Sequence, residues 1–184
     1  MSRTSLPVAV AIAVGAVLAT PAFAEERSCT GTIGAIALDN VFVPDGAICV
    51  LKKTRLNGNV VVGTNARLTA ISVTVNGNVQ AEGAQSVTIE GRSTIGGSVQ
   101  VVQGYGVTVT GATIKGNVLI DDNNGPVLAK RNRVNADMQL FQNSGGARLV
   151  DNAIKGNLQC KENSPPPTGS GNTAASKEDQ CAGL

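Results

Sequence analysis

The sequence contains no histidine, which removes the commonest general base and the commonest zinc ligand. Chemistry would therefore fall to carboxylates, and the acidic pair Asp121 and Asp122 opens the stretch DDNNGP. A glycosidase pair must flank one bond, whereas adjacent residues of a strand point to opposite faces. An EF-hand calcium loop needs glycine at its sixth position and glutamate at its twelfth, and here Asn132 is the twelfth. We interpret DDNNGP as a solvated turn; a sugar site would combine the pair with Lys130 and Arg131.

Amide side chains form two regularly spaced sets that are the best candidates for binding. One set comprises Asn59, Asn78, Asn117 and Asn157, with Ser98 and Asp137 at equivalent positions. The other comprises Gln80, Gln100, Gln139 and Gln159, preceded by Val61 and interrupted by Leu119. Stacked amides can satisfy one another along an axis, so a structural ladder is the simpler interpretation. The functional alternative is a flat polar strip that binds a glycan or a protein. A third, weaker hypothesis is ice binding by Thr69, Thr88 and Thr108.

These residues belong to an internal repeat. The sequence IKGNV at 114–118 recurs as IKGNL at 154–158. The repeat is aligned on Gly58, Gly77, Gly97, Gly116, Ala136 and Gly156, in steps of 19 or 20 residues. Apolar residues stand two before and two and four after each of these positions, which is the alternation of a half-buried strand. A second strand is predicted ten to thirteen residues after each glycine, as at Leu68 and Ala70. The glycines are expected to let the backbone bend without a clashing Cβ.

Short strands repeated about every 20 residues without helical periodicity predict an all-β, single-stranded parallel β-helix. We expect six to seven coils of 19–20 residues, capped at both ends. A right-handed winding is expected, because parallel crossovers strongly favour that hand.

The spelling Φ-x-G-N-V between Leu56 and Leu158 resembles the right-handed parallel β-helices of the pectate-lyase-like superfold. It is more distantly similar to the coils of bactofilins, bacterial proteins that polymerise end to end. The resemblance covers roughly residues 34–160. It implies a fold rather than an activity, since this superfold includes lyases, hydrolases, adhesins and inert scaffolds.

The four cysteines fit the same architecture. Cys29 and Cys49 are 20 residues apart and Cys160 and Cys181 are 21 apart, which is one coil in each case. Residues one coil apart are stacked neighbours within reach of a disulfide. We predict the disulfides Cys29–Cys49 and Cys160–Cys181, one at each end. A four-thiolate metal site would need closely spaced cysteine pairs, so neither a metal nor a cofactor is predicted.

The chain is expected to be an exported, bacterial protein of four segments. Residues 1–24 read as a signal peptide, with an apolar run followed by Ala22-Phe23-Ala24. Residues 25–55 are assigned to an N-terminal cap and irregular first coil, 56–160 to the repeats, and 161–184 to a polar, proline-rich C-terminal cap unable to form a strand ladder. The expected location is periplasmic or extracellular, with no membrane insertion after cleavage.

Charge balance narrows the expected partners. Without Arg3 there are 14 basic and 13 acidic residues, which predicts no electrostatic binding of nucleic acid or anionic lipid. The local basic run of Lys130, Arg131 and Arg133 contains too few charges to change this expectation and is interpreted as a solvated turn. With no convincing catalytic set, the sequence favours a non-enzymatic scaffold that binds a cell-surface glycan or protein through the Asn/Gln-rich strand face. A polysaccharide-active enzyme and a self-assembling polymer remain as alternatives, and the oligomeric state is left open.

Overall fold

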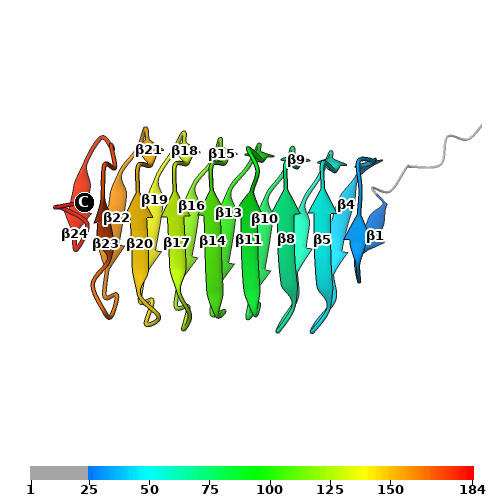
Figure 1. Cartoon of the computed structure of the whole chain (residues 1–184), viewed down its shortest axis with the longest axis horizontal. Coiled ribbons are helices and arrows are strands. Elements are labelled where there is room, and N and C mark those ends of the chain that lie inside the picture. The colour runs from blue at the N-terminus through cyan, green and yellow to red at the C-terminus, as the bar shows by residue number, and fades with distance from the viewer. Residues whose placement is uncertain (1–24) are drawn as a thin grey trace, which may run out of the picture.

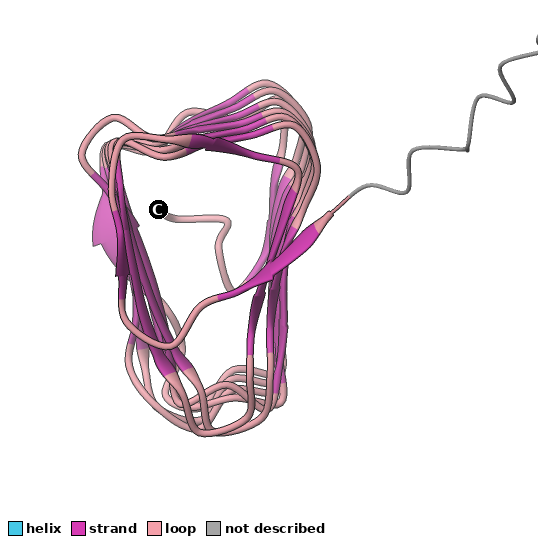
Figure 2. Ribbon diagram, turned by 90° about the vertical axis from the view of Figure 1, so that its right-hand side faces the viewer, coloured by secondary structure: helices cyan, strands magenta, loops and turns pink. Residues whose placement is uncertain are grey.

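The computed structural model describes residues 25–184, so the predicted signal peptide lies outside the described residues. The chain winds into a parallel β-solenoid of about eight turns that stack along one axis (Figure 1). Each complete turn contributes one strand to each of three parallel sheets, which enclose a three-sided tube (Figure 2). Among these residues no helix is long or apolar enough to cross a bilayer.

Sheet A is the widest of the three sheets and has nine strands. Its strands are β1 (Glu26–Ser28), β4 (Asn40–Val43), β7 (Val60–Val62), β10 (Val79–Glu82), β13 (Val99–Val102), β16 (Val118–Asp121), β19 (Met138–Phe141), β22 (Leu158–Lys161) and β24 (Lys177–Asp179).

Sheet B has eight strands and sheet C has seven. Sheet B consists of β2 (Thr32–Ile33), β5 (Ile48–Lys52), β8 (Arg67–Ile71), β11 (Ser86–Glu90), β14 (Gly106–Thr110), β17 (Val127–Lys130), β20 (Ala147–Val150) and β23 (Thr168–Ser170). Sheet C consists of β3 (Ala37–Leu38), β6 (Arg55–Leu56), β9 (Thr74–Val75), β12 (Thr94–Ile95), β15 (Thr113–Ile114), β18 (Arg133–Val134) and β21 (Ala153–Ile154).

The core is a dry stack of aliphatic columns, as the repeat predicts. Val79, Val99 and Val118 pair in register in sheet A and are fully buried. Equivalent buried columns run through sheets B and C, as at Leu68 and Ile95. Side chains alternate between core and surface along each strand, so each turn adds a layer of buried apolar area to its neighbours.

The solenoid has more turns than the six to seven expected, because both terminal segments also contribute strands. Residues 25–55 form β1 to β5 and the start of β6. In the C-terminal segment, β23 pairs with β20 and β24 pairs with β22, both in parallel. The expectation that this proline-rich segment could not join a strand ladder is therefore wrong. Its last residues fold across the end of the tube (Figure 2), where Leu184 packs against the core.

Both disulfides expected from the spacing are present. Cys29–Cys49 joins the first two turns with a Cα–Cα distance of 5.5 Å, and Cys160–Cys181 joins the last two with 5.2 Å. Each bond therefore connects neighbouring coils at one end of the stack. Disulfides persist in oxidising compartments, so they indicate a non-reducing location for the folded protein.

Candidate functional site

The predicted asparagine column exists and is part of the structural frame. We call it the corner ladder; its members are Asn40, Asn59, Asn78, Ser98, Asn117, Asp137 and Asn157. The side-chain oxygen of each member accepts a hydrogen bond from the backbone N–H of the next, at 2.8 to 3.1 Å. The oxygens of Asn59, Asn78 and Asn117 are therefore engaged within the protein, which favours a structural role for them.

The repeated glycine beside this ladder has a different role from the one expected. None of the glycines at 58, 77, 97, 116 and 156 has a positive φ. A Cβ at Gly97 would instead clash with the side-chain oxygen of Asn78, and one at Gly116 would clash with the hydroxyl of Ser98. The missing side chain thus leaves room for the ladder oxygen of the preceding coil, rather than permitting a bend.

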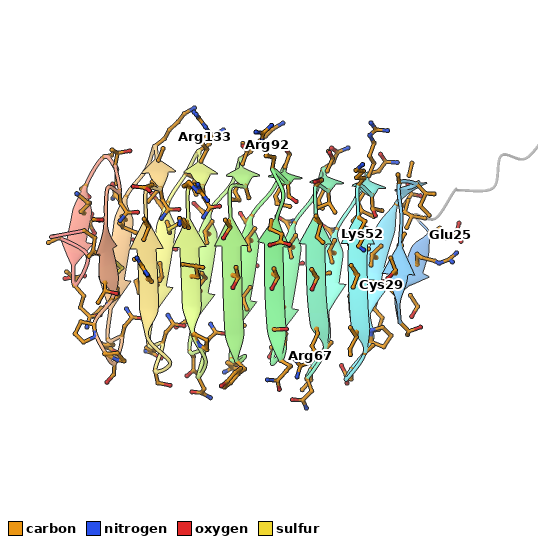
Figure 3. All side chains as sticks on the ribbon, viewed as in Figure 1. Glu25, Cys29, Lys52, Arg67, Arg92 and Arg133 are labelled. Carbon is orange, nitrogen blue, oxygen red and sulfur yellow. A yellow bond between two sulfur atoms is a disulfide. The ribbon has the colours of Figure 1, made fainter. Side chains whose placement is uncertain are left out.

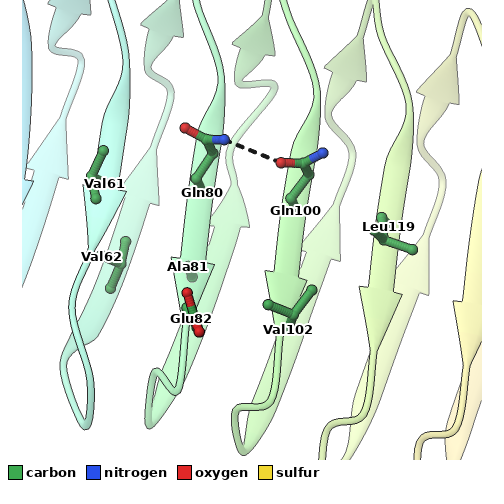
Figure 4. Close-up of a pocket in the computed structure, with 8 residues that line it drawn as sticks. All are labelled: Val61, Val62, Gln80, Ala81, Glu82, Gln100, Val102 and Leu119. Atoms are coloured by element: carbon green, nitrogen blue, oxygen red, sulfur yellow. Dashed lines mark hydrogen bonds between the residues drawn. The ribbon is translucent and has the colours of Figure 1, made fainter.

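The glutamines form a second column, on the outer face of sheet A. This glutamine column runs in register through Val61, Gln80, Gln100, Leu119, Gln139, Gln159 and Glu178. Gln80 donates to Gln100 at 3.2 Å (Figure 4), and Gln139 donates to Gln159 at 2.7 Å. Gln159 in turn donates to Glu178, and this bond together with one from Ser176 lowers the pKa of the Glu178 carboxyl. Leu119 separates the two glutamine pairs.

The first glutamine pair lies in a shallow hollow of about 370 Å³ on this face (Figure 4). Aliphatic side chains of Val61, Val102 and Leu119 surround Gln80 and Gln100. The carboxylate of Glu82 adds an acceptor at the edge of the hollow. Amide donors and acceptors set among apolar surface suit a ligand that presents hydroxyl or peptide groups beside apolar faces.

Asp121 and Asp122 do not assemble an acid–base site. Asp121 ends β16 and lies in register between Val102 and Phe141. One of its carboxyl oxygens is buried without a hydrogen-bond partner, and burial, followed by the nearby charge of Asp122, raises the pKa of Asp121. A separate hollow of about 200 Å³ is lined by Asp121 and Phe141 but not by Asp122, which is exposed in the left-handed conformation.

The basic residues suggested for a sugar site lie elsewhere. Lys130 ends β17 and Arg131 follows it, whereas Asp121 and Asp122 precede that strand at its other end. The structure therefore places the two pairs at different corners of the tube. Within residues 25–184, no three His, Cys, Asp or Glu side chains come together as a metal site.

Two buried asparagine ladders were missed in the sequence, and we call them the inner ladders. One contains Asn123, Asn143 and Asn163 and ends at Gln180; the other contains Asn132, Asn152 and Asn172. Asn123 and Asn132 are fully or almost fully buried, although sequence analysis placed Asn123 in a solvated turn. Their spacing of 20 residues was the available signal. It was overlooked because asparagine is common in exposed turns.

The threonine column on sheet B is confirmed as a column. Thr69, Thr88 and Thr108 pair in register on its outer face. Val50 precedes them and Leu128 follows them in the same column, so the row of hydroxyl groups spans three coils.

In comparisons with known proteins, no family model, no curated protein and no solved structure matched this chain. The structure therefore supports a parallel β-solenoid and no assignment to the pectate-lyase-like proteins.

Proposed function

We propose that this protein is a non-enzymatic scaffold of an oxidising compartment outside the cytoplasm, which binds a glycan or a protein through the outer face of sheet A. A disulfide at each end and a continuous core give this face a fixed shape. A fixed surface loses little conformational entropy on binding, so weak contacts repeated along it can add up.

The observation that carries the proposal is the hollow around Gln80 and Gln100. These two side chains are exposed, and unlike the side chains of the corner ladder they bond to each other rather than to the backbone. An amide can make more hydrogen bonds than this single one, so donor and acceptor capacity is left for a ligand. The aliphatic neighbours Val61 and Leu119 supply apolar contact area beside it.

The test replaces both glutamines by arginine and measures binding on a glycan array and in pull-downs against cell-envelope proteins. The matched control is the double variant Thr88→Arg and Thr108→Arg, because these residues occupy the same two coils on sheet B. We expect Gln80→Arg with Gln100→Arg to abolish a signal that the control retains. If both variants kept the binding signal, or both lost it to the same extent, the hollow would not be the binding site.

The alternative of a polysaccharide-active enzyme is favoured by one observation, the raised pKa of Asp121 beside a surface hollow. Such shifts accumulate at catalytic sites but also arise from burial alone. A cleavage assay on acidic and neutral polysaccharides distinguishes the two. Turnover that disappears in Asp121→Asn would support the enzyme over the scaffold.

The second alternative, an end-to-end polymer, would require both ends of the tube to expose strand edges. The last residues of the chain fold across the C-terminal end, which opposes stacking there (Figure 2). Negative-stain electron microscopy of the purified protein tests this alternative, and filaments would favour it.

A further inference from the structure

The near balance of charge in this chain conceals a strongly asymmetric distribution. The corner where sheet B meets sheet C, which we call the B–C corner, begins at the last residues of the sheet B strands and ends with the first residues of the sheet C strands. One turn places Lys52, Lys53 and Arg55 there, and another places Lys130, Arg131 and Arg133. Arg92 lies at the same corner on a turn between them.

Seven of the 14 basic residues of the described chain thus lie at one corner, accompanied by two acidic residues, Glu90 and Asp151. The corner carries a net charge of +5 (7 − 2), and the remainder of residues 25–184 carries −4 (7 − 11). The single ion pair within 4.0 Å in this part of the chain joins Lys161 to Glu162, so no corner cation is neutralised by a close carboxylate.

The basic groups are regularly spaced along the solenoid axis. They occur on the turns of β5, β11 and β17, which alternate with the uncharged corner positions of β8 and β14. Two coils correspond to roughly 9.5 Å along the axis. Arg92 and Arg133 project from the same edge of the molecule, and Arg67 lies at the opposite edge (Figure 3).

The backbone turns sharply at this corner. Lys53, Arg92 and Arg131 adopt positive φ angles of 57°, 62° and 54°. This conformation costs a side chain about 1 kcal/mol or more relative to glycine. Glycine occupies the equivalent position at Gly111 without difficulty, where an added Cβ would meet open space. Ser72 and Asp151 adopt the same conformation at this corner in other turns, so the positive φ belongs to the corner itself and the case for binding depends on the charge and the hollow beside it.

A hollow of about 580 Å³ lies between the basic turns. Arg92 stands on one side of it and Arg131 and Arg133 on the other. Thr110 and Thr113 line its floor, where their hydroxyls can donate hydrogen bonds beside the guanidinium groups. Phosphate groups suit this combination, because guanidinium binds them through paired, charge-assisted hydrogen bonds.

We propose that the B–C corner docks the protein onto a membrane surface that displays anionic phospholipid headgroups. The corner is a convex edge in cross-section (Figure 2), so a flat surface can contact it along its length. The negative remainder of the molecule turns this edge toward an anionic surface and the other faces away from it. The glutamine column then stays free to bind its ligand, so this inference is independent of the proposed function.

A single strand of nucleic acid fits the corner less well. Its binding sites stack bases on aromatic side chains. The aromatic residues of the described chain are Phe42, Tyr105 and Phe141. Phe42 and Phe141 belong to sheet A, and Tyr105 lies between β13 and β14, so none of them is at the B–C corner.

The test is co-sedimentation of the protein, expressed from its full-length sequence, with phosphatidylcholine vesicles that do or do not contain one-third phosphatidylglycerol. The triple variant Arg92→Ser, Arg131→Ser, Arg133→Thr uses the residues that Ser72 and Thr113 provide at equivalent positions in other turns. The control variant replaces Arg27, Arg67 and Lys161 by serine, which removes the same charge from other parts of the surface. Thermal unfolding verifies that all three proteins fold.

We expect phosphatidylglycerol-dependent binding that weakens as salt is added. At about 1 kcal/mol for each basic residue near an anionic surface, the corner variant should lose about a hundredfold in affinity. The control variant should lose less than about tenfold in affinity for the same vesicles.

Four results would overturn the proposal. The first is an equal loss of vesicle binding in both variants, and the second is vesicle binding that does not depend on phosphatidylglycerol. The third is displacement of the protein from vesicles by inorganic phosphate at the same phosphate concentration as the lipid. The fourth is binding of single-stranded DNA that is tighter than vesicle binding and depends in the same way on the corner arginines. Displacement by phosphate would identify a site for the free anion rather than for a membrane. The DNA result would reassign the corner to nucleic acid.

Discussion

Replacing Asn143 by alanine is expected to destabilise the solenoid severely, because this side chain occupies the middle of an inner ladder. Its Oδ1 accepts hydrogen bonds from the backbone N–H and the side-chain amide of Asn123, both at 3.1 Å. Its Nδ2 donates to the carbonyl of Ile120 and to the side chain of Asn163, both at 2.9 Å. Asn143 is 1% exposed, so water cannot replace these partners.

The magnitude follows from the four bonds that are lost. Each buried hydrogen bond contributes about 1 kcal/mol net, and an orphaned buried donor or acceptor costs about 1–3 kcal/mol. The N–H of Asn123 loses its acceptor and the carbonyl of Ile120 loses a donor. We therefore expect the free energy of unfolding to fall by about 3–5 kcal/mol.

The assay is urea unfolding followed by circular dichroism, with Asn117→Ala as the control. Asn117 belongs to the corner ladder and is itself exposed, and its side chain accepts one bond, from the N–H of Asp137 at 3.0 Å. The control should lose less than about 1 kcal/mol. If Asn143→Ala proved no more damaging than Asn117→Ala, burial of the inner ladder would not be what makes it stabilising.

Three further outcomes are expected. Because burial raises the pKa of Asp121, its ionised carboxylate opposes folding. At pH 7 the variant Asp121→Asn should therefore unfold at a higher urea concentration than the parent, and its free energy of unfolding should be greater by a few tenths of a kcal/mol after allowing for solvent screening. This difference should vanish below about pH 4, where the carboxyl is protonated in both the folded and the unfolded state. Replacing Cys160 and Cys181 together by serine should cost about 3 kcal/mol, measured by the same unfolding assay without reductant, because their loop spans 21 residues. Gly145→Ala should lower the melting temperature far more than Gly111→Ala, because a Cβ at Gly145 would overlap the backbone of Gly125. Gly111 faces open space, so its substitution should cost only the strain of a positive φ, about 1 kcal/mol. Equal melting temperatures would contradict the close packing of coils at Gly145.

The stacking of coils was readable from the sequence because each lap repeats the same buried apolar positions. Val99 and Val118, for example, are paired residues of adjacent strands and are fully buried. The spacing of the cysteines, 20 and 21 residues, predicted both disulfides for the same reason, because residues one lap apart lie in neighbouring coils. Periodicity is a global property of the fold, so it survives irregularities in any one turn.

The features that the sequence did not reveal lie at the corners of the solenoid. Amino-acid composition does not show whether a polar corner residue is buried. Asn123 resembles a turn residue in DDNNGP, yet it is fully buried because its amide completes the bonding of neighbouring backbones. The prolines at 165–167 argued against a strand, but Thr168–Ser170 pairs with β20 immediately after them. The charge of the B–C corner was equally hidden, since Arg92 is far from Arg131 in sequence and joins it only through winding.

The ladders also have a direction along the axis. In the corner ladder the N–H of Asn59 donates to Asn40 of the turn before it, whereas in an inner ladder the N–H of Asn143 donates to Asn163 of the turn after it. During synthesis the N-terminal turns emerge first, so a corner-ladder donor meets an acceptor that has already been made. An inner-ladder donor must wait for the next lap, and the final acceptor is Gln180, close to the chain end. The early turns can therefore wind as the chain emerges, while the later ones lock together only once the last few residues have arrived.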